Sequence, residues 1–331
     1  MINRELIRLK LVQTAYSYYQ KHVHNPEVAE KELLVSMSHA HDLYNFMLLL
    51  MVEVNRMGLR SYEMRLNRSH RLNETVRENR KFIDNRFMAQ LENDRQLIAF
   101  RDSQAFSWME HEDFLRHLYT QIEESEYYQQ YMNSGISTFE EDREIWRLIY
   151  RHLICNNEEL DEVLEGMCLY WNDDKVVVDT FVLKTINRFT ADGDNDKALM
   201  PEFRNDADRE FALRLLRRAL NGADYFRELI AANTKNWDYR RIALMDRIIL
   251  QFGLAEITSF PGIPLSVSIN EYVEVAHMYS TPKSGKFINA TLDRISKQLI
   301  KEHKLVKDEL VRGPKHVDLP NNEENQSAEK E

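Results

Sequence analysis

One stretch near the end of the chain is apolar on almost every side of the helix that it would form. Between positions 242 and 257 the apolar residues recur at helical spacing and fill most of the positions between. Asp246, Arg247 and Gln251 interrupt this pattern on one side near its start. A helix that is apolar nearly all round is buried in a protein core. We therefore expect this helix to be the centre of a helical core, covered by other helices.

Two further helices are predicted after a loop at 260–264. Ser268 and Glu271 have the spacing of a capping box, in which two side chains satisfy free backbone N–H groups at a helix start. Thr281 followed by Pro282 suits an N-cap and a first helical position. The last helix then carries one apolar stripe, formed by Ile288, Leu292, Ile295 and Leu299.

The scarcity of turn-forming residues predicts helices along the whole chain. Glycine occurs 9 times and proline 7 times among 331 residues, whereas Leu, Glu and Arg are abundant. That composition favours long helices and few turns, and so an all-α protein. A first helix is expected over residues 2–21, and a longer one with a dense apolar face over 30–57. The length allows one large or two ordinary domains with a real core.

Several other classes of protein and site are disfavoured. The longest apolar run, at 46–52, is too short to span a bilayer, and no signal-like segment opens the chain, so a cytoplasmic location is expected. Cys155 and Cys168 do not make a disulfide framework. His39 and His41 lie two positions apart, point away from each other on a helix and are poor co-ligands for a metal. With no phosphate-binding glycine loop and no nucleophile–base signature, we expect no catalysis, cofactor or metal.

Two segments near the C-terminus carry a resemblance to a known family. INEYVEVA stands at 269–276 and SGKFINATLD at 284–293. In type and separation they resemble the two markers of the NusB family of bacterial transcription antitermination factors. VQTAY at 12–16 is similar to the end of that family's first helix. The resemblance implies an all-α fold, a multi-helix NusB-like bundle enlarged by an additional helical region.

The resemblance also implies a division of the chain. Residues 1–22 would supply the first helix of the NusB-like unit, and 201–312 its C-terminal helical core. Between them, 23–200 would be a helical insertion about which the family says nothing. The polar, acidic tail at 313–331 cannot bury enough apolar surface to fold.

The family resemblance implies a function in binding. NusB joins the ribosomal protein NusE, and the pair holds a boxA-like single-stranded RNA and helps to load an antitermination complex onto RNA polymerase at ribosomal RNA operons. Lys and Arg would meet phosphates, Phe and Tyr would stack on bases, and Asp and Asn would read base edges. The RNA-binding residues implied are Arg4, Arg8, Tyr16, Asp246, Arg247, Lys283, Lys286, Phe287 and Asn289. Lys283 stands where the family often has an acidic residue, a change that should favour RNA.

Two alternatives stay open. The first is a helical protein-binding adaptor without RNA binding, because the net charge is −10 and Glu5, Leu6 and Ile7 thin the arginine-rich start seen in the family. The second is an RNA-binding module linked to ribosomal RNA modification, since a similar helical module belongs to a ribosomal RNA cytosine methyltransferase. That enzyme also needs an α/β domain with a glycine-rich loop and catalytic cysteines, which this sequence lacks. Steeply salt-dependent RNA binding would argue against the adaptor.

Overall fold

The computed structural model of the chain describes residues 1–21, 25–72, 79–171, 173–193, 197–203, 205–234 and 238–308. Within these ranges all regular structure is helical, apart from one isolated bridge between Ile2 and Phe203. The predicted all-α class is therefore confirmed. The predicted tail at 313–331 lies outside the described residues. None of the described helices is both long and apolar enough to cross a membrane.

The chain divides into two compact units, and each combines segments that are distant in sequence. Unit 1 comprises Met1–Lys10 and Glu27–Glu210, and unit 2 comprises Leu11–Pro26 and Phe211–Glu331. The first helix, α1 (Arg4–Gln20), and α10 (Asp206–Asn221) each contribute residues to both units. The predicted first helix over 2–21 is thus confirmed, with slightly shorter ends.

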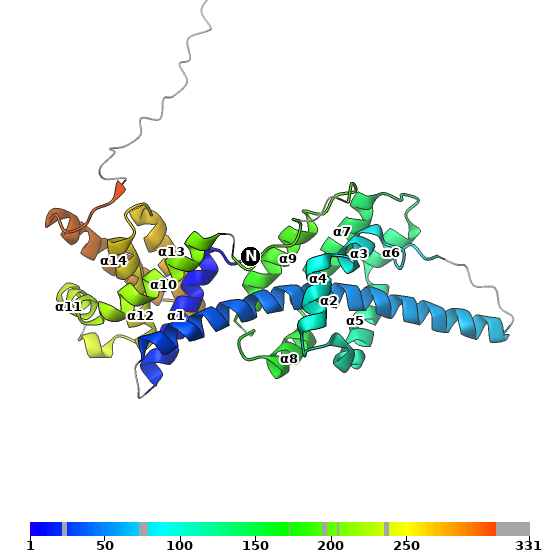
Figure 1. Cartoon of the computed structure of the whole chain (residues 1–331), viewed down its shortest axis with the longest axis horizontal. Coiled ribbons are helices and arrows are strands. Elements are labelled where there is room, and N and C mark those ends of the chain that lie inside the picture. The colour runs from blue at the N-terminus through cyan, green and yellow to red at the C-terminus, as the bar shows by residue number, and fades with distance from the viewer. Residues whose placement is uncertain are drawn as a thin grey trace, which may run out of the picture. The chain divides into compact units, whose positions relative to one another are not determined.

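Unit 1 is built on one long helix, α2 (Pro26–Leu72), which runs through it in Figure 1. The sequence predicted this helix to end near residue 57, where its apolar residues become sparse. The helix continues because Tyr62 and Ser69 are still buried beyond that point. The other helices of unit 1 are α3 (Arg86–Glu92), α4 (Arg95–Ser103), α5 (Glu112–Glu124), α6 (Glu126–Asn133), α7 (Phe139–Ile149), α8 (Glu158–Met167) and α9 (Lys175–Ile186), with short turns η1 (Trp108–His111) and η2 (Tyr150–Ile154).

Stacked aromatic rings fill part of the core of unit 1. The Phe46 ring lies 4.2 Å from that of Trp108 and 5.4 Å from that of Trp171, measured between centroids. The Trp108 indole N–H donates to the Phe46 carbonyl at 2.8 Å, so the buried polar atom of this ring has a partner. These contacts fix α2 against the η1 turn and against the segment between α8 and α9.

Unit 2 is a bundle around α12 (Leu244–Ser259), which packs against α13 (Leu265–Tyr279) and α14 (Ser284–Lys301). Figure 1 shows these three with α11 (Ala223–Asn233). Every residue of α12 from Ile248 to Ile257 is buried, which confirms the helix predicted from the apolar stretch. Its close contact with α14 depends on Gly253, where a Cβ would lie 3.0 Å from Leu292 Cδ1.

The predicted starts of α13 and α14 are wrong. The capping box of Ser268 and Glu271 does not form, because α13 already begins at Leu265. The Ser268 hydroxyl instead donates at 2.8 Å to Glu256, a fully buried carboxylate of α12. Similarly, α14 begins at Ser284 and its N-cap residue is Lys283, so Thr281 and Pro282 belong to the preceding turn.

Candidate nucleic-acid interface

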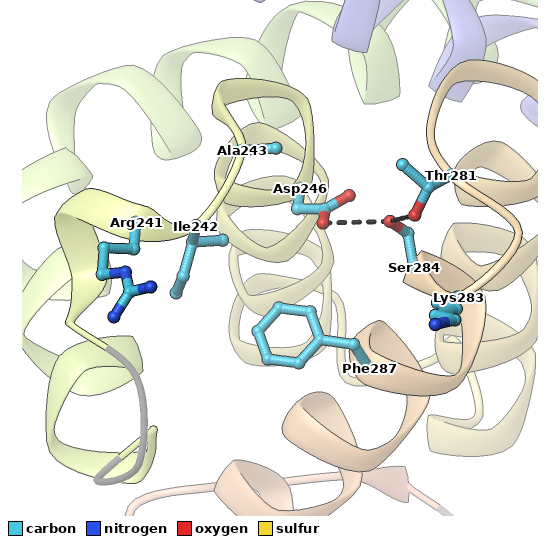
Figure 2. Close-up of a pocket in the computed structure, with 8 residues that line it drawn as sticks. All are labelled: Arg241, Ile242, Ala243, Asp246, Thr281, Lys283, Ser284 and Phe287. Carbon is cyan, nitrogen blue, oxygen red and sulfur yellow. Dashed lines mark hydrogen bonds between the residues drawn. The ribbon is translucent and has the colours of Figure 1, made fainter.

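A pocket of about 360 Å³ opens in unit 2 where the start of α12 approaches the start of α14. Three predicted site residues, Asp246, Lys283 and Phe287, meet in this pocket although 41 positions separate the first from the last. The full lining, drawn in Figure 2, is Arg241, Ile242, Ala243, Asp246, Thr281, Lys283, Ser284 and Phe287.

Asp246 holds the turn that forms one wall of the pocket. Its carboxylate lies in the first turn of α12 and is buried. Ser280 Oγ donates to Asp246 Oδ1 at 2.6 Å, and Ser284 Oγ donates to Oδ2 at 3.0 Å. Thr281 Oγ1 lies 2.9 Å from Ser284 Oγ and extends this network, part of which is drawn in Figure 2. Asp246 thereby fixes the start of α14, and both of its oxygens already accept a hydrogen bond.

The close approach of α13 and α14 brings the same turn into place. Gly285 is buried in the first turn of α14, and a Cβ there would overlap with His277 Nε2. Because His277 belongs to α13, any larger side chain at 285 has to displace the imidazole ring. The close packing of α14 against His277 therefore explains why a glycine stands at this position of the SGKF segment.

Phe287 and two cations give the pocket its chemical character. Figure 2 shows the half-buried Phe287 ring extending from α14 into the space that faces Ile242 and Arg241. Arg241 is exposed and comes from η3 (Tyr239–Arg241), whereas Lys283 is exposed at the N-cap of α14. Neither cationic side chain has a hydrogen bond or ion pair with a described residue. An aromatic face between two free cations can stack on a base and bind its phosphates, and a helix start adds free N–H groups.

Arg247 lies beside this pocket and does not line it. Its guanidinium carbon is 5.3 Å from the centroid of the Tyr239 ring, at cation–π distance. Burial raises the pKa of Tyr239, and the nearby charge of Arg247 opposes that shift. Arg247 thus packs against the turn that carries Arg241.

Three further predicted residues of unit 2 do not line the pocket; two of them lie on α14 and one on α1. Lys286 and Asn289 are exposed on the first two turns of α14. Tyr16 of α1 is 38% exposed, and its hydroxyl accepts a hydrogen bond from Gln20 at 3.0 Å. One turn earlier, Gln13 donates to the hydroxyl of Tyr279 at 2.7 Å, which ties α1 to the end of α13.

Arg4 and Arg8 belong to unit 1 and have different surroundings from the other predicted residues. Arg4 Nε lies 3.4 Å from an oxygen of Asp208. Arg8 is only 3% exposed, so an RNA contact by its guanidinium requires the side chain to leave a buried position. The assignment of these two arginines to an RNA surface stays a prediction.

Among the polar residues in and beside the pocket, sequence reasoning missed Arg241 and the two serines that bind Asp246, of which Ser284 lines the pocket. Arg241 directly precedes the apolar stretch, so a cation at the start of the buried helix was a visible signal. Ser280 and Ser284 gave no such signal, because their partner Asp246 is more than thirty positions away.

The fold and the pocket define an all-helical protein with a cationic and aromatic surface site. Comparison with known proteins identifies the family: the chain belongs to the NusB family, whose sequence profile matches residues 176–297. The transcription antitermination protein NusB of Salinibacter ruber is 37% identical over an alignment of 121 residues, which covers 34% of this chain and 75% of that protein. NusB of Finegoldia magna is also 37% identical over an alignment of 121 residues, which covers 35% of this chain and 88% of that protein. A solved structure of T. maritima NusB has 25% identity and a TM-score of 0.28, over 47% of this chain and 91% of that one.

The profile match includes the whole pocket and excludes the start of the chain. Residues 176–297 contain Arg241, Asp246, Lys283 and Phe287, together with nearly all of α9 and most of α14. Arg4, Arg8 and Tyr16 lie outside it. The chain is therefore a NusB family member in which a large helical region precedes the matched part.

Proposed function

We propose that this chain is a transcription antitermination factor that binds a boxA-like single-stranded RNA through unit 2. In this proposal it acts in the cytoplasm together with the ribosomal protein NusE, within an antitermination complex on RNA polymerase at ribosomal RNA operons. The chain would bind and position the RNA without catalysing a reaction. One observation carries the proposal: the pocket places the Phe287 ring between two cations, Arg241 and Lys283, that are free of ion pairs with described residues.

The chemistry of the pocket supports single-stranded RNA over duplex nucleic acid. A base can reach Phe287 only if it is unstacked from its neighbours, which is easy in a single strand. The phosphates on either side of that base would then face Arg241 and Lys283. Lys286 and Asn289 on the exposed side of α14, and Tyr16 on α1, would extend the interface. Asp246 would act mainly by holding the start of α14 in place.

The test is binding of a labelled boxA-like RNA to the full chain over a salt series, with and without NusE. Loss of base stacking in Phe287→Ala should weaken binding by about 1–3 kcal/mol. Lys283→Glu and Arg241→Glu should weaken it and also flatten its salt dependence, by roughly 0.7 in the log–log slope for each phosphate of a single strand that is no longer neutralised. Lys297→Glu is the matched control, because Lys297 lies on the same helix, is 72% exposed and forms its ion pair with Asp293 one turn earlier.

The adaptor without RNA binding is the second candidate. The pairing of Arg4 with Asp208 and the burial of Arg8 favour it, because they leave the N-terminal helix with little free positive charge. A stable complex with NusE that binds no boxA-like RNA at any salt concentration would establish the adaptor and refute the proposed RNA site. Equal effects of Lys283→Glu and Lys297→Glu would show that RNA binds elsewhere.

A further inference from the structure

The turn between α8 and α9 in unit 1 presents apolar side chains to solvent. Leu169 is 80% exposed and Tyr170 46% exposed. The Tyr170 ring stacks on that of His39 at 4.8 Å between centroids, which joins the turn to α2. One helical turn before His39, Val35 is 47% exposed. We name Val35, Leu169 and Tyr170 the apolar patch.

The exposed Leu169 and Tyr170 are directly followed by a residue that is anchored in the core. This residue, Trp171, is 1% exposed and stacks on Phe46 in the core. Its indole N–H donates to the His39 carbonyl at 2.9 Å, and its backbone N–H donates to the Cys168 carbonyl at 3.0 Å. Trp171 is thus packed inward, while Leu169 and Tyr170 directly before it are exposed to solvent.

Apolar side chains that are exposed singly need no explanation, whereas contiguous exposed ones mark interaction sites. A partner that covers Leu169 and Tyr170 removes apolar area from water, which stabilises the complex. The patch thus has the physical properties of a docking surface.

The charge beside the patch indicates the chemistry of the partner. The adjoining helix α8 carries five acidic residues, Glu158, Glu159, Asp161, Glu162 and Glu165, and no basic one. Glu162 and Glu165, on the last two turns before Leu169, are exposed and form no ion pair with a described residue. Such a surface repels nucleic acid and attracts positive charge.

We propose that the apolar patch docks a cationic, amphipathic segment of a protein partner. An apolar side chain of that segment would cover Leu169 and Tyr170, and its Lys or Arg residues would face Glu162 and Glu165. This surface lies in unit 1 and is independent of the RNA site proposed for unit 2.

The experiment uses the full chain and a fluorescent synthetic helix with one Lys face and one Leu face as the probe, followed by anisotropy. Leu169→Asp separates docking from simple charge attraction. The variant adds a negative charge, so attraction alone predicts tighter binding, whereas docking predicts weaker binding because the probe no longer meets an apolar side chain. The residue is exposed, so the change leaves the core intact. Val267→Asp is the control, since Val267 is an exposed valine of unit 2 at 41%.

The expected result is a roughly tenfold loss of affinity in Leu169→Asp, as for an interface anchor. A similar loss is expected in the double variant Glu162→Lys/Glu165→Lys, with no loss in Val267→Asp. Unchanged or tighter binding by Leu169→Asp, or no binding of the peptide at low salt, overturns the proposal. Light scattering that shows a dimer of the native chain, converted to monomer by Leu169→Asp, also overturns it in favour of a second copy of this chain as the occupant.

Discussion

His41 of α2 is a histidine whose surroundings favour the uncharged ring. Its Nε2 lies 3.0 Å from the carbonyl oxygen of Met200, and the ring stacks against Tyr44. Burial lowers the pKa of His41, and the hydrogen bond to Met200 opposes that shift without cancelling it. The folded chain therefore takes up a proton at this site less readily than the unfolded chain does.

This difference predicts a dependence of stability on pH. Because the pKa of the folded state lies below the unfolded value of 6.5, the stabilisation is fully present above pH 6.5. It is lost progressively as the pH falls below that value toward the folded pKa. Urea denaturation of the native chain and of His41→Gln at pH values from about 8 to about 5 should therefore show a smaller loss of stability in the variant. The control is His70→Gln, which replaces an exposed histidine of the same helix and should behave like the native chain. If the stability of the native chain and of both variants changed with pH in the same way, His41 would not be the source of the pH dependence.

Helix packing in unit 2 depends on small residues at close contacts. Gly253 of α12 faces Leu292 of α14 and Tyr272 of α13, whose nearest side-chain atoms would lie 3.0 and 3.4 Å from an added Cβ. The buried Glu256, one turn later, accepts from Ser268 at 2.8 Å and from Tyr272 at 3.2 Å. Close approach and buried hydrogen bonds thus fix α13 and α14 against the same side of α12.

Gly253→Val should destabilise unit 2 because the branched side chain has no room between these helices. Overpacking of this kind costs about 1–3 kcal/mol, which urea denaturation would measure as a lower midpoint. Gly166→Ala in α8 is the opposite case, since no atom lies within 4 Å of an added Cβ there. The greater helix propensity of alanine should make that variant as stable as the native chain or more so, by up to about 1 kcal/mol. A Gly253→Val variant of native stability would show that α12 and α14 can separate freely.

At the scale of the helices, sequence reasoning succeeded where the signal lay within one continuous stretch. It failed where the structure depends on contacts between residues that are distant in the sequence. The position of α12 could be predicted because burial on all sides leaves a continuous apolar pattern between 242 and 257. The start of α13 could not, because Ser268 and Glu271 match a local capping pattern while the actual partner of Ser268 is Glu256, twelve residues earlier. For the pocket, family resemblance pointed to Lys283 and Phe287. Arg241 is visible in the sequence as a cation before the buried helix, but its place in the same pocket as Phe287 appears only when α12 and α14 are folded together.

At the scale of the whole chain, α1 contributes residues to both units, and the long segment Glu27–Glu210 of unit 1 separates its second half from the rest of unit 2 in the sequence. Its second half belongs to unit 2, where Leu11, Val12 and Ala15 are fully buried. Gln251 of α12 donates to the hydroxyl of Tyr19 at 2.7 Å. We therefore propose that 1–22 and 201–312 together form the NusB-like folding unit, with 23–200 as an insertion between them.

This proposal predicts that the fragment 201–312 is incomplete without α1. Expressed alone, the fragment exposes the apolar surface that Leu11, Val12 and Ala15 cover, and it should unfold with low cooperativity. A synthetic peptide of residues 1–22, added in trans, should bind the fragment, raise its helical circular dichroism and sharpen its thermal transition. The matched peptide with Ala15→Asp should fail, because it buries a carboxylate without a partner. A fragment that unfolds cooperatively alone and binds neither peptide would contradict the proposed unit. It would mean that α1 is held mainly by its part in unit 1, which ends at Lys10.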